Sequence, residues 1–125
     1  MLPLALVWLA VTAWAQAPRQ ARAEFSGGGL SYAHSEPAGP DRAPLLIALG
    51  GEWADWQPET ARRGWLLAMP DSRLLRAPGD AAATALEGLV EDALRRLPAD
   101  ENRVYQVGHA AAAIEDHRRG GAPAR

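Results

Sequence analysis

The chain has 125 residues, a formal net charge of −2 and no cysteine. This length allows one domain at most, and the absence of cysteine excludes disulfides, thiolate metal ligands and a cysteine nucleophile. All 13 basic residues are arginine, which also excludes a lysine Schiff base and a phosphate-loop lysine. We expect no nucleic-acid partner, because the near-neutral charge does not supply a basic surface.

The N-terminal segment has the pattern of a signal peptide. Residues 2–15 carry no charge, Ala15-Gln16-Ala17 is a small-x-small cleavage site, and Pro18 and Arg19 end the apolar run. The run is shorter than the ~20 residues that span a bilayer and is typical of a signal sequence. We therefore expect removal of residues 1–17, a secreted or periplasmic protein, and no membrane span after removal. A buried helix and a misassigned start codon are the alternatives.

The next segment, residues 18–29, consists mostly of polar and small residues and is interpreted as a flexible lead-in. Its three glycines, Gly27-Gly28-Gly29, indicate a turn or bulge. A phosphate cradle is disfavoured, because no strand precedes the glycines and no helix start follows them. Residues 30–34 then predict a short strand, which the Pro-rich segment 37–40 ends.

Two short apolar runs predict buried strands. Residues 45–49 are bounded by Pro44 and Gly50-Gly51, and residues 65–69 are followed by Pro70-Asp71-Ser72. Runs of this kind fit strands covered on both faces, as in a parallel sheet flanked by helices.

Two helices are predicted after these strands. Pro58 suits a first helical turn, so a helix over 58–63 is expected, with Gly64 as its left-handed cap. The periodic apolar residues of 81–97 predict the longest helix, with Asp80 as its N-cap and a loop over 73–80 before it.

The last predicted strand, residues 104–107, is followed by Gly108-His109 and an alanine-rich segment of high helix propensity. Residues 118–125 are expected to be a disordered tail. The order of elements is an α/β pattern with a domain over 30–117. Ligands of such sheets meet the carboxyl ends of the strands. A tight strand-turn-helix at the last of these ends would hold a central serine at a strained, exposed position.

These segments together resemble the N-terminal half of the α/β-hydrolase superfamily. More narrowly, the chain is similar to exported esterases of the phospholipase/carboxylesterase and polyhydroxybutyrate-depolymerase-like groups. Residues 44–51 resemble the strand that leads to the oxyanion loop, 63–72 the next strand, and 100–109 the strand that enters the nucleophile turn. The resemblance covers roughly residues 30–114 and implies about four mostly parallel strands with flanking helices.

The chain departs from this family at its chemical centre. Gly108-His109-Ala110-Ala111-Ala112 stands where the family has Gly-x-Ser-x-Gly. The nucleophile position is therefore Ala110, whose side chain has no atom that attacks a carbonyl. Gly50 replaces the usual histidine of the oxyanion strand, and the later strands that supply the triad acid and histidine do not appear in the sequence.

The resemblance implies a site at the top of the sheet without a catalytic residue. Oxyanion-hole candidates are Gly50, Gly51 and Ala111, and pocket candidates are Trp53, Asp71, Ser72 and His109. A hidden catalytic role for Ser72 is disfavoured because no base is evident. A metal site from His109, Asp116 and His117 is disfavoured because no fourth ligand is evident, so we expect neither metal nor cofactor.

The expected function is that of an α/β-hydrolase-like protein, descended from a serine carboxylic-ester hydrolase, that has lost its activity. The first alternative is a non-catalytic module that binds a small ester or acyl ligand, or another protein. The second is a truncated gene product, whose exposed sheet edge would favour self-association. Trp53, Trp56 and Trp65 are interpreted as core or lid packing, with a carbohydrate platform as the alternative.

Overall fold

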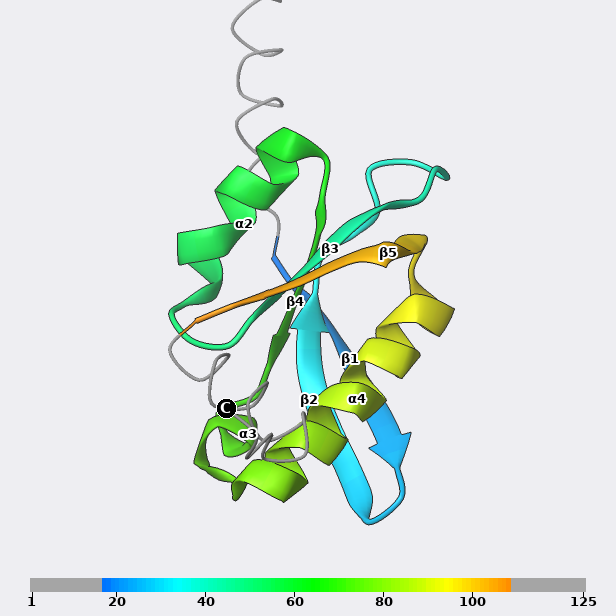
Figure 1. Cartoon of the computed structure of the whole chain (residues 1–125). Coiled ribbons are helices and arrows are strands. Elements are labelled where there is room, and N and C mark those ends of the chain that lie inside the picture. Colours follow the sequence, from blue (N-terminus) through cyan, green and yellow to red (C-terminus); the bar gives the residue numbers. More distant parts are fainter. Residues whose placement is uncertain (1–16, 109–125) are drawn as a thin grey trace, which may run out of the picture.

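A mixed sheet of five strands organises the chain, in the order β1-β2-β4-β3-β5. The computed structural model describes residues 17–108 (Figure 1). The strands are β1 (Arg19–Phe25), β2 (Gly28–His34), β3 (Ala43–Ala48), β4 (Leu66–Pro70) and β5 (Ala99–Val107). The helices are α2 (Trp53–Arg63), α3 (Arg73–Arg76) and α4 (Gly79–Arg96). The predicted α/β class, with helices flanking a sheet, is confirmed.

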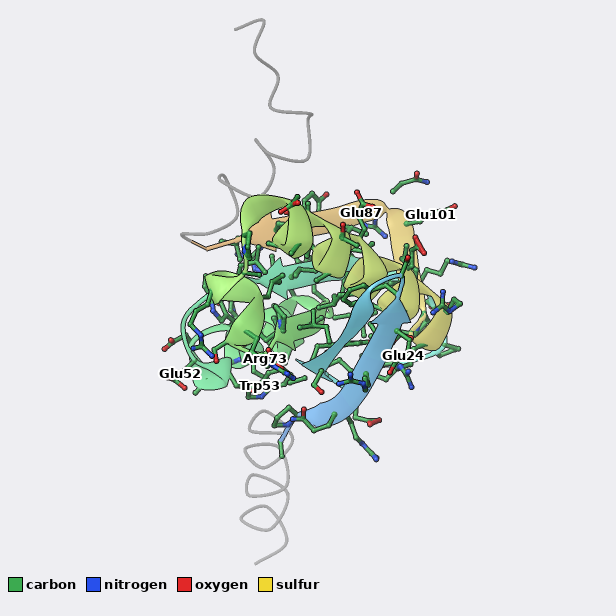
Figure 2. The ribbon with its side chains drawn as sticks, turned by 90° about the horizontal axis from the view of Figure 1, so that it is seen from below. Glu24, Glu52, Trp53, Arg73, Glu87 and Glu101 are labelled. Carbon is green, nitrogen blue, oxygen red and sulfur yellow. The ribbon has the colours of Figure 1, made fainter. Side chains whose placement is uncertain are left out.

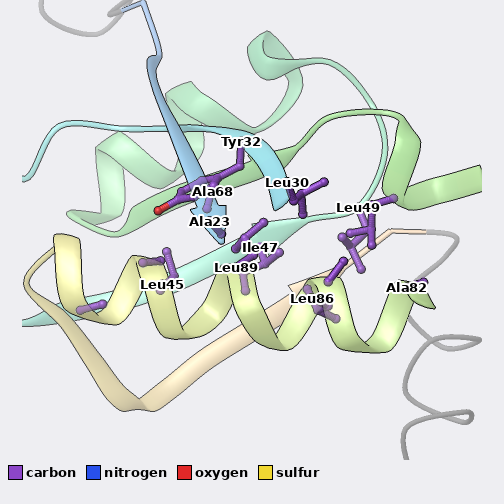
Figure 3. Packing of buried hydrophobic residues seen from close by; sticks show 14 of the residues in the cluster. Ala23, Leu30, Tyr32, Leu45, Ile47, Leu49, Ala68, Ala82, Leu86 and Leu89 are labelled. Carbon is purple, nitrogen blue, oxygen red and sulfur yellow. The ribbon is translucent and has the colours of Figure 1, made fainter. Parts of the chain in front are cut away.

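The centre of the sheet is β3, which runs parallel to β4 on one side and to β5 on the other. Its residues Leu45 and Ile47 are fully buried under α4, where Leu86 and Leu89 pack against them (Figure 3). Helix α2 packs instead against β4. Coverage by helices explains why β3 is an unbroken apolar run, as the sequence predicted.

The predicted flexible lead-in over 18–29 is wrong, because this segment forms an antiparallel hairpin with β2. Strand β1 pairs with β2 along its whole length, from Arg19↔His34 to Phe25↔Gly28. Ala23 is fully buried, and Phe25 packs on α4 at Gly88, whose missing side chain leaves room for the ring. The hairpin also corrects the expected four mostly parallel strands to five strands with two antiparallel pairs.

Helix α2 begins earlier than predicted, so Pro58 lies inside the helix and not in its first turn. The amide of Glu52 donates to Asp55 Oδ2 at 2.7 Å, and this bond stabilises the beginning of the helix at Trp53. Gly64 ends the helix at φ 72°, which confirms the predicted left-handed cap.

Three other boundaries differ from prediction. The expected loop over 73–80 contains the short helix α3. Helix α4 begins at Gly79, so Asp80 lies in its first turn and is not the N-cap. Strand β5 begins at Ala99 and includes a shift in register between its pairings with Ala43 and Leu45.

No helix among residues 17–108 is long and apolar enough to cross a membrane.

A buried polar network joins the hairpin to α4. The hydroxyl of Tyr32, which is 1% exposed, donates to Asp92 Oδ2. Asp92 also accepts from Arg96, at 3.0 Å from Nε, and from Arg95 at 3.4 Å. Burial and the bond to Asp92 raise the pKa of Tyr32 to about 12. Burial opposes ionisation of Asp92, but the hydrogen bonds from Arg96 and Tyr32 outweigh it and lower the pKa of Asp92.

We predict that Tyr32→Phe lowers the free energy of unfolding by about 1–3 kcal/mol, because it removes a buried hydrogen bond to a carboxylate. The matched control is Tyr105→Phe, since Tyr105 is 46% exposed and its loss of a hydroxyl is expected to change stability by under about 0.5 kcal/mol. Urea denaturation followed by circular dichroism measures both variants. Equal effects of the two substitutions would contradict the role given to the network.

The stability difference between wild type and Tyr32→Phe is predicted to depend on pH. The pKa of Tyr32 is raised from 10.0 to about 12, so its contribution is fully present below pH 10 and is lost as pH rises towards 12. The contribution of Asp92 is present above its ordinary pKa of 3.8 and is lost as pH falls through its lowered value. The stability difference between wild type and Tyr32→Phe is therefore expected to shrink above pH 10. A difference that stays constant to pH 12 refutes this assignment.

Candidate functional site

The carboxyl ends of β3, β4 and β5 meet at one edge of the sheet, because these strands are parallel. Gly50-Gly51 follows β3, Asp71-Ser72 follows β4, and Gly108 follows β5. Figure 2 shows Trp53 and Arg73, which come just after the first two of these turns, at the same end of the molecule. This edge is where ligands bind in sheets of this kind.

The backbone at Gly108 admits only glycine. Its φ is 130°, and an added Cβ would lie 2.3 Å from the carbonyl oxygen of Leu49. The two strand ends are held there by the Leu49 amide, which donates to the carbonyl of Val107 at 2.7 Å. Gly108 is thus required both by conformation and by the close approach of β3.

The turn after β3 is fixed by a residue whose role the sequence did not reveal. The indole Nε1 of Trp56 donates to the carbonyl of Gly50 at 2.9 Å. A Cβ at Gly51, where φ is 78°, would lie 2.9 Å from the same nitrogen. Trp56 was interpreted as core or lid packing, and the structure makes it the anchor of the glycine turn. The sequence signal that points to this role is the position of Trp56, six residues after Gly50.

The turn after β4 carries an ion pair. Asp71 Oδ2 lies 3.2 Å from a guanidinium nitrogen of Arg73, and Asp71 Oδ1 accepts from the Arg73 amide at 2.9 Å. Ser72 is exposed and makes no capping bond at the start of α3. The histidine within residues 17–108 is His34, a buried residue of β2 whose Nδ1 lies 2.9 Å from the carbonyl oxygen of Ser35.

The structure therefore brings Gly50, Gly51, Asp71 and Ser72 to one edge, with Trp53 half-buried at the start of α2. The remaining site predictions, His109, Ala110 and Ala111, lie outside the described residues. Residues 1–16 of the predicted signal peptide, the predicted tail over 118–125, and Asp116 and His117 lie outside them too. Among residues 17–108, no group of three His, Asp or Glu side chains is arranged to hold a metal ion.

No protein-family model and no curated protein matches this sequence. Solved structures do match its fold. The thermostable carboxylesterase EstE1, cloned from a metagenomic library, is 18% identical and aligns with 90% of this chain and 47% of its own, at a TM-score of 0.60. A hyperthermophilic esterase from Pyrobaculum calidifontis is 18% identical and aligns with 90% of this chain and 44% of its own, at a TM-score of 0.62.

A putative dienelactone hydrolase from Klebsiella pneumoniae is 15% identical over 73% of this chain and 49% of its own, at a TM-score of 0.55. The chain thus spans about half the length of these structures. At such low identity the likeness concerns the fold, and the fold is that of the α/β-hydrolases.

The two glycine turns give a matched pair of substitutions. Gly108→Ala is expected to destabilise the protein by about 1–3 kcal/mol more than Gly50→Ala, because only the first adds an atom that collides with the Leu49 carbonyl. At Gly50, φ is 142° and an added Cβ meets nothing within 4 Å, so this variant carries the backbone strain alone. Urea denaturation of both variants tests the prediction, which equal losses would contradict.

Proposed function

We propose that the chain is a non-catalytic relative of the serine carboxylic-ester hydrolases, which binds an ester or acyl group at the carboxyl edge of its sheet. The observation that carries this proposal is the turn at Gly108, where glycine is required by φ and by the nearby Leu49 carbonyl. Such a turn in the α/β-hydrolase fold presents the nucleophile two residues later. In this sequence that residue is Ala110.

The chemistry available at this edge is binding without bond cleavage. Attack on an ester needs an oxygen or sulfur nucleophile and a base that accepts its proton. The methyl group of Ala110 supplies no nucleophile, and the described histidine, His34, is buried on β2 beside Ser35. Backbone amides near Gly51 and Ala111 would donate to the carbonyl oxygen of a bound ester, whose C–O bond then stays intact.

The shape of the edge supports a ligand-binding role. Trp56 fixes the Gly50 carbonyl, which holds the turn after β3 in one conformation. At Gly50 an added Cβ would meet nothing within 4 Å, so a ligand can approach the backbone closely at this position. Trp53, which is half-buried, follows this turn as the first residue of α2.

We predict no turnover of p-nitrophenyl acetate or butyrate by the purified protein above the buffer rate, because the nucleophile position carries a methyl group. Ala110→Ser is also expected to stay without turnover, since a serine without a neighbouring base remains a weak nucleophile. Release of nitrophenol followed by absorbance measures both proteins. An acyl adduct on the wild-type chain, detected by intact-mass spectrometry, would overturn the proposal.

The proposed binding of an ester is tested separately from turnover. Ethyl butyrate is the probe, and its binding is followed by ligand-observed NMR. Ala110→Trp is expected to abolish binding by filling the site, whereas Thr84→Trp, at an exposed position of α4, is the control that leaves binding unchanged. Absence of binding to the wild type at millimolar concentration refutes the proposed binding.

A further inference from the structure

A hollow lies between the β1–β2 hairpin and the start of α4. Its volume is about 230 Å³. Its lining residues come from the β1–β2 hairpin, α3 and the first turns of α4, which are labelled in Figure 1. Small and apolar side chains line it, among them Phe25, Leu30, Leu74, Ala77, Ala81 and Ala85. We call this space the hairpin hollow.

Glycine and alanine make up six of the ten residues that line the hollow. Gly27, Gly28 and Gly29 form its hairpin wall, and an added Cβ at Gly27 would meet nothing within 4 Å. The buried part of its lining is apolar and belongs to the core, since Leu30 and Leu74 are 4% and 2% exposed. A hollow with such walls gains more from an alkyl chain than from a polar ligand.

One charged residue lines the hollow, and it is cationic. Arg73 has 68% of its side chain exposed and is paired with Asp71 at 3.2 Å. Exposed ion pairs of this kind contribute little, so an incoming anion competes for the guanidinium at small cost. Asp80, the acid nearest to Ala81 in sequence, accepts a hydrogen bond from the Ala81 amide at 2.9 Å.

We propose that the hairpin hollow binds a medium-chain alkyl carboxylate, with the chain in the hollow and the carboxylate on Arg73. The volume of about 230 Å³ holds roughly eight groups the size of a water molecule, at ~30 Å³ each, which corresponds to a chain of about eight carbons. Arg73 supplies a planar donor pair that matches a carboxylate. The lining of the hollow includes none of the residues that would hold the ester in the function proposed above, so this proposal does not depend on that function.

The test is a chain-length series on the full chain, with butanoate, hexanoate, octanoate and decanoate as probes in ligand-observed NMR. Affinity is expected to rise by about 2- to 4-fold for each added methylene and to level off near eight carbons, where the hollow is full. Octylammonium is expected to bind more weakly than octanoate, because its charge is repelled by Arg73. Affinity that does not depend on chain length overturns the proposal.

Two matched pairs of variants locate the site. Ala81→Trp fills the mouth of the hollow and is expected to abolish octanoate binding, whereas Thr84→Trp, also exposed on α4 but outside the lining, leaves binding unchanged. Arg73→Gln is expected to weaken the affinity for octanoate by roughly 2- to 5-fold. Arg76→Gln, on the same short helix but outside the lining, is expected to leave this affinity unchanged. Equal effects within either pair refute the assignment.

A further variant separates this proposal from the one at the sheet edge. Ala110→Trp is expected to remove ethyl butyrate binding and to leave octanoate affinity unchanged. Loss of octanoate binding in Ala110→Trp would place the carboxylate at the edge and overturn the hairpin hollow as its site. Circular dichroism of each variant confirms that the fold is retained.

Discussion

The parallel pairing of β3 with neighbours on both sides is the constraint on which the rest of the structure depends. It turns the ends of β3, β4 and β5 towards one edge, and it brings Gly108 so close to Leu49 that no side chain fits between them. The helices follow from the same constraint, because a central strand with two apolar faces needs cover on both. α4 covers Leu45 and Ile47 on one face.

The sequence predicts the elements that a local pattern of residues determines, and it does not predict those that depend on contacts between distant segments. β3, β4 and the cap at Gly64 were predicted correctly, since an apolar run or one glycine carries the information locally. β1 was missed because its inward residues include Ala21 and Ala23, which look like small loop residues until α4 covers them. The start of α2 is not evident in the sequence, because Pro58 favours a later first turn whereas the bond from the Glu52 amide to Asp55 stabilises the earlier one.

The candidate site shows the same division. The glycine turns were visible in the sequence, because glycine before a helix marks a turn. The anchor of the first turn, Trp56, was not visible, since a tryptophan beside a predicted helix reads equally well as core. The bond between Tyr32 and Asp92 spans 60 positions, and no pattern in one sequence pairs residues that far apart. Such links emerge only when α4 is placed on the sheet.

The charged segment at the beginning of β5 has a consequence for the behaviour of this protein at high concentration. Among the described strands, β5 stands at one end of the sheet. Its register with β3 shifts across Asp100 to Arg103, where Arg103 and Asp100 form an ion pair at 2.8 Å. The regular stretch beyond it, residues 104–107, is shorter than the six or so residues that stack into fibrils. Charged side chains on such a strand disfavour edge-to-edge pairing of the described sheet with a second copy.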